Sequence, residues 1–156
     1  MAEEFEVRPA RLDEADAVLA GYEWLFAPPG SRPASWNPDW ARIALLDAID
    51  SDSSNVLIAV AGERVVGICT AYLDLLSVRY GLRCWVEDLA VDPESRSLGI
   101  GSALLTAARE WATARGASHL ELNSAAARTD AHRFYAREGA GDPAFSFEWH
   151  GLGADS

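Results

Sequence analysis

Residues 95–105 read S-R-S-L-G-I-G-S-A-L-L and combine one basic side chain with two closely spaced glycines and an apolar run. Gly99 and Gly101 lack the Cβ atoms that would keep a ligand away from the backbone amides, and Arg96 adds a positive charge. The residues that follow are expected to form a helix, whose first N–H groups and positive dipole end point at this loop. Such a loop is typical of a phosphate site, although a glycine-rich helix start without a ligand has the same letters.

Two familiar phosphate loops do not fit these residues. A P-loop needs a lysine directly after its last glycine, and no lysine follows Gly101. A dinucleotide fingerprint that starts at Gly99 requires a small residue where this chain has Leu104. The pattern that remains is R-x-x-G-x-G at a helix start, which suits a pyrophosphate but is a weak signal when it stands alone.

Composition and charge narrow the possible functions. The chain has 156 residues, 49% hydrophobic and 24% charged, which predicts one globular domain over residues 1–156. A formal net charge of −11 disfavours nucleic acid and anionic membranes as partners and favours a cationic small molecule or a basic peptide. The acidic start, M-A-E-E-F-E, and the short apolar runs predict a cytoplasmic protein without a signal peptide or a membrane span.

The cysteines and histidines show no spacing that is typical of a metal site. Cys69 and Cys84 are isolated in apolar surroundings, so we expect buried free thiols. We therefore expect no metal, no serine triad and no covalent enzyme intermediate.

Hydrophobic periodicity predicts the elements that must position the loop. The expected order is β-α-α-β-β-β-α-β-α-β, with strands over residues 5–10, 55–61, 64–76, 82–91, 119–125 and 145–150. Expected helices cover residues 12–26, 38–49, 99–115 and 130–139, with Asp13 and Asp130 as N-caps and Gly116 and Gly139 at helix ends. Consecutive strands should pair antiparallel and the β-α-β crossover should give a parallel pair. The prediction is a mixed, mostly antiparallel α/β sheet flanked by helices.

Four segments, in the same order, resemble the GCN5-related N-acetyltransferase (GNAT) family, whose members transfer acetyl from acetyl-CoA to an amine. V-R-P-A-R-L-D-E-A-D at 7–16 resembles the start of that fold, and G-E-R-V-V-G at 62–67 resembles its hairpin. V-E-D-L-A-V-D-P-E-S-R-S-L-G-I-G-S-A-L-L at 86–105 is similar to the acetyl-CoA motif, and A-H-R-F-Y-A-R-E-G-A at 131–140 resembles the final helix. Two residues depart from the family pattern, Ser97 for a usual glycine and Arg128 for a frequent asparagine.

The resemblance implies where acetyl-CoA would bind. The strand that ends in D-L-A-V would splay from its neighbour and offer backbone groups to the pantetheine arm, while the loop amides would hold the pyrophosphate. Asn123 would lie near the thioester arm, and Arg128 would replace an amide contact with a phosphate contact. The cofactor-binding residues implied in this way are Leu89, Ala90, Val91, Arg96, Ser97, Leu98, Gly99, Ile100, Gly101, Ser102, Asn123 and Arg128.

Direct transfer through a tetrahedral intermediate needs a proton acceptor for the amine and a proton donor for the departing thiolate. Glu87 is the candidate base, because alternation puts it on the face of Leu89 and because the similar polyamine acetyltransferases have a glutamate in a V/L-E-D context. A carboxylate of ordinary pKa is a weak base, so Glu87 would act through water or with a pKa raised by burial. The same alternation points Asp88 to the opposite face. Tyr135 is the candidate acid by resemblance, and a core aromatic is its alternative.

The acceptor pocket is expected at the first two helices and their loop, where aromatic residues are dense. These residues would either clasp a cation or pack in the core, and they are Tyr22, Trp24, Phe26, Trp36 and Trp40. Glu23 and Asp74 could supply charge for an amine. By resemblance a homodimer is expected, with the strand at 145–150 as a possible contact. Two other functions stay open: a non-catalytic acyl-CoA sensor, and a partner protein that uses the fold as an interaction surface.

Overall fold

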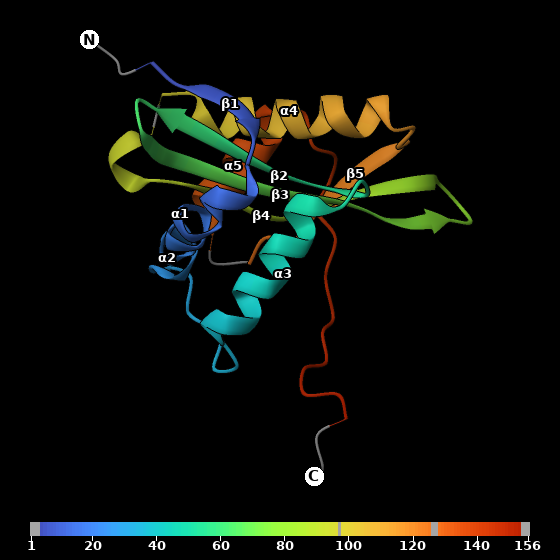
Figure 1. The fold of residues 1–156 in the computed structure, drawn as a ribbon. Coiled ribbons are helices and arrows are strands. Elements are labelled where there is room, and N and C mark those ends of the chain that lie inside the picture. The colour runs from blue at the N-terminus through green and yellow to red at the C-terminus, as the bar shows by residue number, and fades with distance from the viewer. Residues whose placement is uncertain (1–3, 97, 126–127, 154–156) are drawn as a thin grey trace. The chain divides into compact units, whose positions relative to one another are not determined.

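A computed structural model describes residues 4–96, 98–125 and 128–153 (Figure 1). The chain divides into two units, residues 1–122 and residues 123–156, and each is described by itself. The strands are β1 (Glu6–Pro9), β2 (Ser54–Ala61), β3 (Arg64–Ser77), β4 (Gly81–Val91) and β5 (His119–Leu122). The α-helices are α1 (Ala15–Ala20), α2 (Tyr22–Phe26), α3 (Pro38–Asp50), α4 (Ile100–Ala114) and α5 (Thr129–Arg137), and short 3-10 turns cover Leu12–Glu14 and Pro93–Ser95.

The strands form one five-stranded sheet in the order β1-β2-β3-β4-β5. Strands β1 to β4 pair antiparallel with their neighbours, and β4 pairs parallel with β5 across the α4 crossover, as the sequence predicts. The tight turn between β2 and β3 is also as predicted, because Ala61 pairs directly with Arg64 and Gly62 has a φ of 61°. β5 is shorter than expected and ends at Leu122.

Helices cover both faces of this sheet in the first unit, with α4 along one face and α1, α2 and α3 along the other (Figure 1). Alternation along β2 serves both faces, since Leu57 and Ala59 are buried in the core with α4 while Val56 and Ile58 are buried in the core with α1 and α3. We call these two surfaces the α4 face and the α1–α3 face. The mixed, mostly antiparallel sheet flanked by helices confirms the predicted fold class.

One irregularity in β4 interrupts the alternation. Thr70 pairs with Asp88, but the next residue along β3, Ala71, pairs with Val86. Glu87 is therefore the extra residue of a β-bulge. A bulge changes the face on which all later side chains of its strand lie.

The bulge corrects the face predicted for Glu87. Val86 before the bulge and Leu89 after it both pack in the α4 core, so the two residues that share this face are three apart. Ala90 packs in the α1–α3 core instead. The prediction that Glu87 and Leu89 share a face is wrong, because strict alternation does not continue through a bulge.

Gly67 of β3 allows α4 to lie close against the sheet. A Cβ atom at this position would stand 2.7 Å from Ile100 Cγ2 and 2.9 Å from Leu104 Cδ1. Both side chains belong to the buried α4 core, so neither can move without repacking its neighbours. The missing side chain at Gly67 thus helps to set the position of the α4 start.

We expect Gly67→Ala to lower the free energy of unfolding by about 1–3 kcal/mol, the usual cost of overpacking a closed core. Urea denaturation would measure the change as a lower midpoint with an unchanged slope. Gly141→Ala is the matched control, because a Cβ atom there meets nothing within 4 Å. Equal stability of the two variants would contradict the close approach of α4 to β3.

The helix predicted over residues 12–26 is divided in the structure. A 3-10 turn comes first, and Gly21 then separates α1 from α2. A Cβ atom on Gly21 would lie 3.0 Å from the Trp24 ring and 3.3 Å from Ile68 Cγ2, so this segment presses closely on β3. Asp13 is not the N-cap that the sequence suggests, because Arg11 precedes the 3-10 turn and Glu14 precedes α1.

A two-point ion pair ties β1 to the 3-10 turn that follows it. Arg8 donates to Glu14 through Nη1 at 2.7 Å and through Nη2 at 2.8 Å, and the Arg11 backbone N–H donates to Glu14 Oε1 at 2.9 Å. The hydrogen bond from Arg8 is the main reason that the pKa of Glu14 falls from 4.5 to about 2. The Glu14 carboxylate is thus stabilised in the folded state.

The lowered pKa of Glu14 predicts a loss of stability in acid. The pair contributes fully above pH 4.5, the ordinary value, and its contribution disappears as the pH falls toward about 2. Allowing for solvent screening, we expect Glu14→Gln to cost about 1–2 kcal/mol at pH 7 and close to nothing at pH 2. Thermal unfolding of both proteins across this range would measure the difference, and a constant difference would contradict the assignment.

The second unit holds α5 and a C-terminal segment. α5 begins one residue earlier than predicted, with Arg128 rather than Asp130 at the N-cap position. Gly139 follows the helix with a φ of 91°, so the predicted end is correct.

The strand predicted over residues 145–150 does not form, so that prediction is wrong. Phe145, Phe147 and Trp149 are 93%, 80% and 76% exposed. Alternating aromatic residues become a strand only when another strand accepts their backbone hydrogen bonds, and the described residues of the second unit contain no such neighbour.

Candidate active site

The loop from β4 to α4 begins with a capped 3-10 turn. Asp92 Oδ1 accepts a hydrogen bond from the Glu94 backbone N–H at 3.0 Å. Arg96 follows in an extended conformation with an exposed side chain, and Leu98 is 38% exposed. Ser97, which the sequence predicts as a pyrophosphate ligand, lies outside the described residues.

Helix α4 starts with backbone amides that its N-cap residue cannot bond. Gly99 occupies that position with a φ of 83°, a left-handed conformation that favours glycine, and it has no side chain to act as a cap. The helical ladder begins with the Ala103 N–H, which donates to the Gly99 carbonyl at 3.0 Å, so the N–H groups of Ile100, Gly101 and Ser102 precede it. These amides, the helix dipole and Arg96 fit a pyrophosphate such as that of CoA.

Strand β4 extends beyond its parallel neighbour. The last pair between β4 and β5 joins Val86 to Leu122, whereas β4 itself continues to Val91. Within the described residues of the first unit, the edge of β4 after the bulge has no strand partner. The resemblance predicts that β4 splays from its neighbour along this edge.

Two residues on this open edge turn their backbone groups outward. The Asp92 N–H donates to the Val66 carbonyl of β3 at 2.9 Å. Because hydrogen-bonded residues alternate along an antiparallel pair, the backbone of Ala90 also faces β3, while Leu89 and Val91 face the open edge. An extended amide chain such as pantetheine can hydrogen-bond to such an edge.

Two hydroxyl groups hold Asp88 on the α1–α3 face. Tyr22 Oη donates to Asp88 Oδ2 at 2.6 Å, and Thr70 Oγ1 donates to the same oxygen at 2.8 Å. The Asp88 backbone N–H donates in turn to Thr70 Oγ1 at 3.1 Å. Thr70 is only 1% exposed, so it fixes the bulge and the carboxylate together.

Burial dominates the electrostatics of this group. Desolvation raises the pKa of Asp88, the hydrogen bonds from Tyr22 and Thr70 oppose the shift, and the charge of Glu87 adds to it. Desolvation and the nearby Asp88 also raise the pKa of Tyr22 and of Tyr72. Asp88 is therefore a stronger base than an ordinary aspartate, and the Tyr22 hydroxyl stays protonated as its donor.

Glu87 lies on the bulge with an exposed side chain. Its Oε2 accepts a hydrogen bond from the Trp85 indole N–H. Trp85 pairs with Tyr72, which packs against the α1–α3 core. Both acidic residues of the bulge thus lie toward the α1–α3 face, Glu87 in solvent and Asp88 largely buried.

The structure brings together only part of the aromatic set that the sequence predicts. Tyr22 and Trp36 stack with centroids 5.9 Å apart, and Phe26 meets Trp36 edge-on at 4.8 Å. Trp24 packs in the α1–α3 core, and Trp40 is 69% exposed on α3. The cluster of Tyr22, Phe26 and Trp36 joins the Asp88 site through the Tyr22 hydroxyl.

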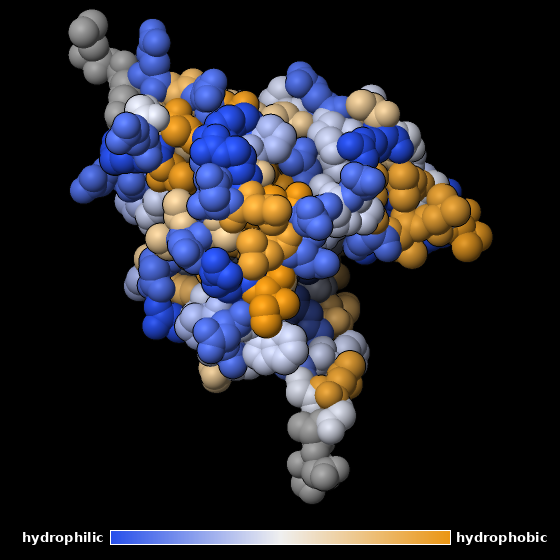
Figure 2. Space-filling model, in the orientation of Figure 1, coloured by the Kyte–Doolittle hydropathy of each residue, from blue (hydrophilic) through white to orange (hydrophobic). Residues whose placement is uncertain are grey.

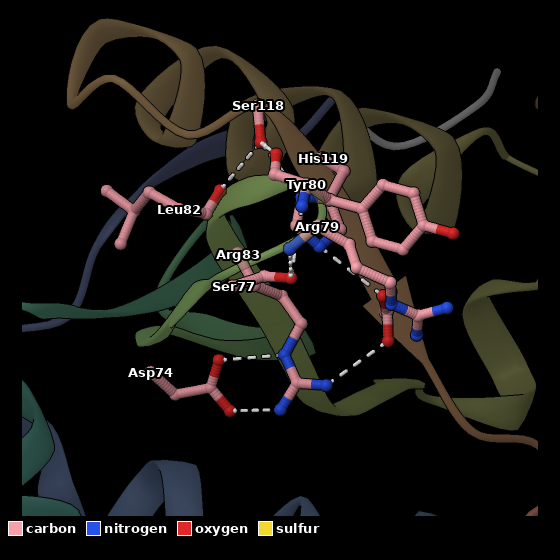
Figure 3. A network of polar contacts seen from close by, with 9 residues as sticks. Asp74, Ser77, Arg79, Tyr80, Leu82, Arg83, Ser118 and His119 are labelled. Atoms are coloured by element: carbon pink, nitrogen blue, oxygen red, sulfur yellow. Dashed lines mark hydrogen bonds and ion pairs between the residues drawn. The ribbon is translucent and has the colours of Figure 1, made fainter.

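Arginines engage the two other carboxylates that the sequence offers for an amine. Glu23 pairs with Arg32, whose guanidinium also lies 5.4 Å from the centroid of the Phe26 ring. Asp74 accepts two hydrogen bonds from Arg83, at 3.0 and 2.8 Å (Figure 3). An arginine already balances the negative charge of each carboxylate, so neither is well placed to bind a substrate cation.

Ser118 and His119 are in contact in the group of polar residues around Arg83 (Figure 3). Their hydrogen bonds hold the backbone in place and do not form a catalytic pair. Ser118 Oγ lies 2.9 Å from His119 Nδ1, and His119 Nε2 lies 3.4 Å from Glu121. The Ser118 hydroxyl also contacts the Tyr80 and Leu82 carbonyl oxygens, to which it can only donate. It therefore fastens the end of the β3–β4 hairpin to the start of β5.

The remaining predicted residues lie in the second unit. Asn123 Nδ2 donates to Ser146 Oγ at 3.2 Å. Arg128 is the N-cap residue of α5. Tyr135 is partly buried on α5, and its ring meets Phe134 edge-on with centroids 5.3 Å apart.

Both cysteines are buried free thiols, as predicted. Burial raises the pKa of Cys69 to about 12 and that of Cys84 to about 11. Neither thiol forms a nucleophilic thiolate readily at neutral pH.

Comparison with known proteins places the chain in a family. A model of the Acetyltransferase (GNAT) family matches residues 19–140, and the chain belongs to this family. An uncharacterized N-acetyltransferase YhdJ of Bacillus subtilis is 33% identical over 90 residues, which cover 58% of this chain and 63% of that protein. An aminoalkylphosphonate N-acetyltransferase of Salmonella typhimurium is 36% identical over 90 residues, which cover 58% of each chain. The match thus spans less than two thirds of either relative.

Solved structures extend the likeness to nearly the whole fold. The aminoglycoside N-acetyltransferase AAC(6')-Iy in complex with CoA has a TM-score of 0.79 at 15% identity, over 96% of this chain and 95% of that one. At such low identity the likeness concerns the fold alone. Within the described residues, no helix is long and apolar enough to cross a membrane, and no cluster of three or more His, Cys, Asp or Glu is placed to hold a metal.

Proposed function

We propose that this chain is an acetyl-CoA-dependent N-acetyltransferase that acts on a primary amine of a small molecule or peptide. The observation that carries the proposal is the pairing of a glycine-capped helix start with the open edge of β4 in one unit. The first element suits a pyrophosphate and the second suits an amide-containing arm. Family membership supports the same reading, as do a relative named as an N-acetyltransferase and a structural neighbour that binds CoA.

In this proposal, different parts of the chain bind different parts of acetyl-CoA. The amides from Ser97 to Ser102 and the Arg96 side chain hold the pyrophosphate, and the backbone groups of Leu89 and Val91 hold the pantetheine arm. Asn123, at the thioester arm, and Arg128, at a phosphate, are further proposed ligands of acetyl-CoA. No metal takes part.

The chemistry is direct attack of the amine on the thioester. Glu87 acts as base through water, which suits its exposed carboxylate at the bulge. Tyr135 gives a proton to the departing CoA thiolate, for which a phenol of pKa near 10 need not be ionised beforehand. Both cysteines are buried with raised pKa values, which favours direct transfer over a covalent enzyme intermediate.

A screen of amines and peptides with acetyl-CoA, followed by the release of free CoA, tests this function. Aminoalkylphosphonates and aminoglycosides belong in the panel, because a relative and structural neighbours are named for them. We expect CoA release that depends on the added amine. Tight binding of acetyl-CoA without release for any acceptor would identify a sensor, and no binding at all would overturn the proposal.

We further propose a cytoplasmic homodimer. Free buried thiols suit a reducing compartment. Figure 2 shows apolar surface where the β3–β4 hairpin protrudes in Figure 1, and the exposed large hydrophobic residues of this hairpin are Leu75, Leu76, Val78 and Tyr80. An exposed apolar group of this kind is typical of a contact surface. Sedimentation equilibrium would give the mass in solution, and a monomer at all concentrations would exclude the dimer.

A further inference from the structure

The Asp88 site has one feature that the proposed function leaves unused. Tyr22 and Thr70 both donate to Oδ2, and no donor among the described residues reaches Oδ1. The carboxylate is thus fixed through one oxygen and has the other available for a further partner. A carboxylate oxygen accepts hydrogen bonds only, so that partner must be a donor.

A cation would be a suitable partner for Asp88 Oδ1. The titratable groups that act on Asp88 are Tyr22 from α2 and Glu87 from β4, and Asp88 in turn raises the pKa of Cys69 and Tyr72 on β3. None of these groups is positively charged. Asp88 Oδ1 is not among the buried, unpartnered atoms of the described residues, so a ligand can reach it, and a bound ammonium group would supply both a positive charge and a donor there.

The surroundings also suit an amine. Tyr22 links the carboxylate to the stacked ring of Trp36, and aromatic rings favour the ammonium group and carbon chain of an amine. The carboxylates of Glu23 and Asp74 are already paired with arginines, which leaves Asp88 better placed to attract a substrate cation. Asp88 also lies directly before Leu89, on the side of the bulge where the edge of β4 is open.

We propose that Asp88 binds the substrate amine through Oδ1 and is the first acceptor of its proton, with Tyr22 and Thr70 as positioning residues. This inference rests on the proposed acetyl transfer. An N–H bond of the ammonium breaks as an O–H bond forms on Oδ1, which frees the nitrogen lone pair. That pair forms the C–N bond to the thioester carbonyl carbon, and the C–S bond breaks.

The remaining protons then balance the reaction. The nitrogen loses a second proton to water as the amide forms, Tyr135 gives its hydroxyl proton to the CoA thiolate, and Tyr135 then regains a proton from water. Asp88 returns its own proton to water beside the exposed carboxylate of Glu87. The water-mediated role of Glu87 is thus a relay to solvent that follows Asp88.

The test compares three single substitutions under saturating acetyl-CoA with n-butylamine and phenethylamine. Asp88→Asn keeps an oxygen to accept from Tyr22 and Thr70, and it should lower kcat roughly 100-fold while the Kd for acetyl-CoA stays within about twofold. Glu87→Gln should cause a smaller loss, of roughly fivefold. Asp47→Asn removes an exposed carboxylate of α3 and controls for the change in net charge, with turnover unchanged within about twofold.

The pH profile separates catalysis from a purely structural role. The rate should rise with pH as Asp88 deprotonates, and Tyr22→Phe should move this rising limb to higher pH, because the lost hydrogen bond stabilised the carboxylate. A limb that stays in place in Tyr22→Phe, or near-wild-type turnover in Asp88→Asn with a large loss in Glu87→Gln, would overturn the assignment of Asp88.

Amine binding without acetyl-CoA keeps the two proposals apart. Calorimetry with n-butylammonium chloride at pH 7 should show binding to the wild-type protein and at least a tenfold weaker affinity for Asp88→Asn. If the wild-type protein binds the amine through Asp88 but never releases CoA, the proposed transfer fails while the amine site stands. Equal amine affinity in both proteins would overturn the site itself.

Discussion

Gly101→Trp should abolish the binding of acetyl-CoA while the protein remains folded. The indole would occupy the space in front of the first amides of α4, which precede the helical ladder and bond to no N-cap side chain. Hydrogen bonds to a charged group contribute about 1.5–3 kcal/mol each, so the loss of two of them weakens binding by about 100-fold or more. Isothermal titration with acetyl-CoA would measure the affinity, and circular dichroism would report the fold.

The fold should tolerate this substitution because position 101 lies in the first turn of α4 and is partly exposed. Tryptophan is also a better helix former than glycine. Gly141→Trp is the control for added bulk, since its Cβ atom would meet nothing within 4 Å, and it should bind like the wild-type protein. Unchanged affinity in Gly101→Trp would remove the pyrophosphate from this helix start.

The sequence predicts most of the first unit correctly because its signals are local. Alternation in β2, the two-residue turn at Gly62 and Glu63, and Gly116 with its positive φ of 88° after α4 each depend on a few neighbouring residues. These signals also determine which strands are consecutive, and consecutive strands pair. The parallel pair of β4 and β5 then follows from the helix that joins them.

The face of Glu87 and the contacts of Asp88 could not be predicted in the same way, although Asp88 does lie opposite Leu89 as alternation predicts. A bulge depends on how two strands register against each other, and nothing in V-E-D-L-A-V marks Glu87 as the extra residue. Strict alternation therefore assigned Glu87 to the wrong face. The bond from Tyr22 joins residues 66 positions apart, and no local pattern announces such a contact.

Burial explains why this difference matters for the chemistry. From the sequence, Glu87 is the candidate base, acting through water or with a pKa raised by burial, but the sequence does not show which acidic residue is buried. In the structure burial raises the pKa of Asp88, the residue that alternation had turned away from the site. The hydrogen bonds from Tyr22 and Thr70 to Asp88 depend on how the helices pack on the sheet, so the sequence alone does not predict them.

The C-terminal segment shows the opposite error, in which a clear pattern has no structural result. F-S-F-E-W-H alternates as a strand does, yet these residues are exposed and pair with no strand in the described unit. Alternation states which side chains share a face, whereas a strand also requires a partner for its backbone groups. The pattern was sufficient for β2 because β1 and β3 lie on either side of it.

Tyr135→Phe should lower turnover by roughly 100-fold or more, within the range of a lost general acid, and should change the Kd for acetyl-CoA by less than about twofold. The substitution removes only the hydroxyl, so the ring can keep its edge-on contact with Phe134 and α5 should stay folded. Single-turnover acetyl transfer measures the chemical step, and titration with acetyl-CoA measures binding separately.

The control for Tyr135→Phe is Tyr80→Phe, which removes a hydroxyl from a residue that is 56% exposed on the β3–β4 hairpin and should leave turnover unchanged. A proton donor to the thiolate acts only as the C–S bond breaks, so its loss must appear in kcat and not in the affinity for acetyl-CoA. A parallel loss of affinity and turnover would instead indicate that Tyr135 shapes the cofactor site. Wild-type turnover would leave the residue as a packing aromatic of α5, and the thiolate would then take its proton from water.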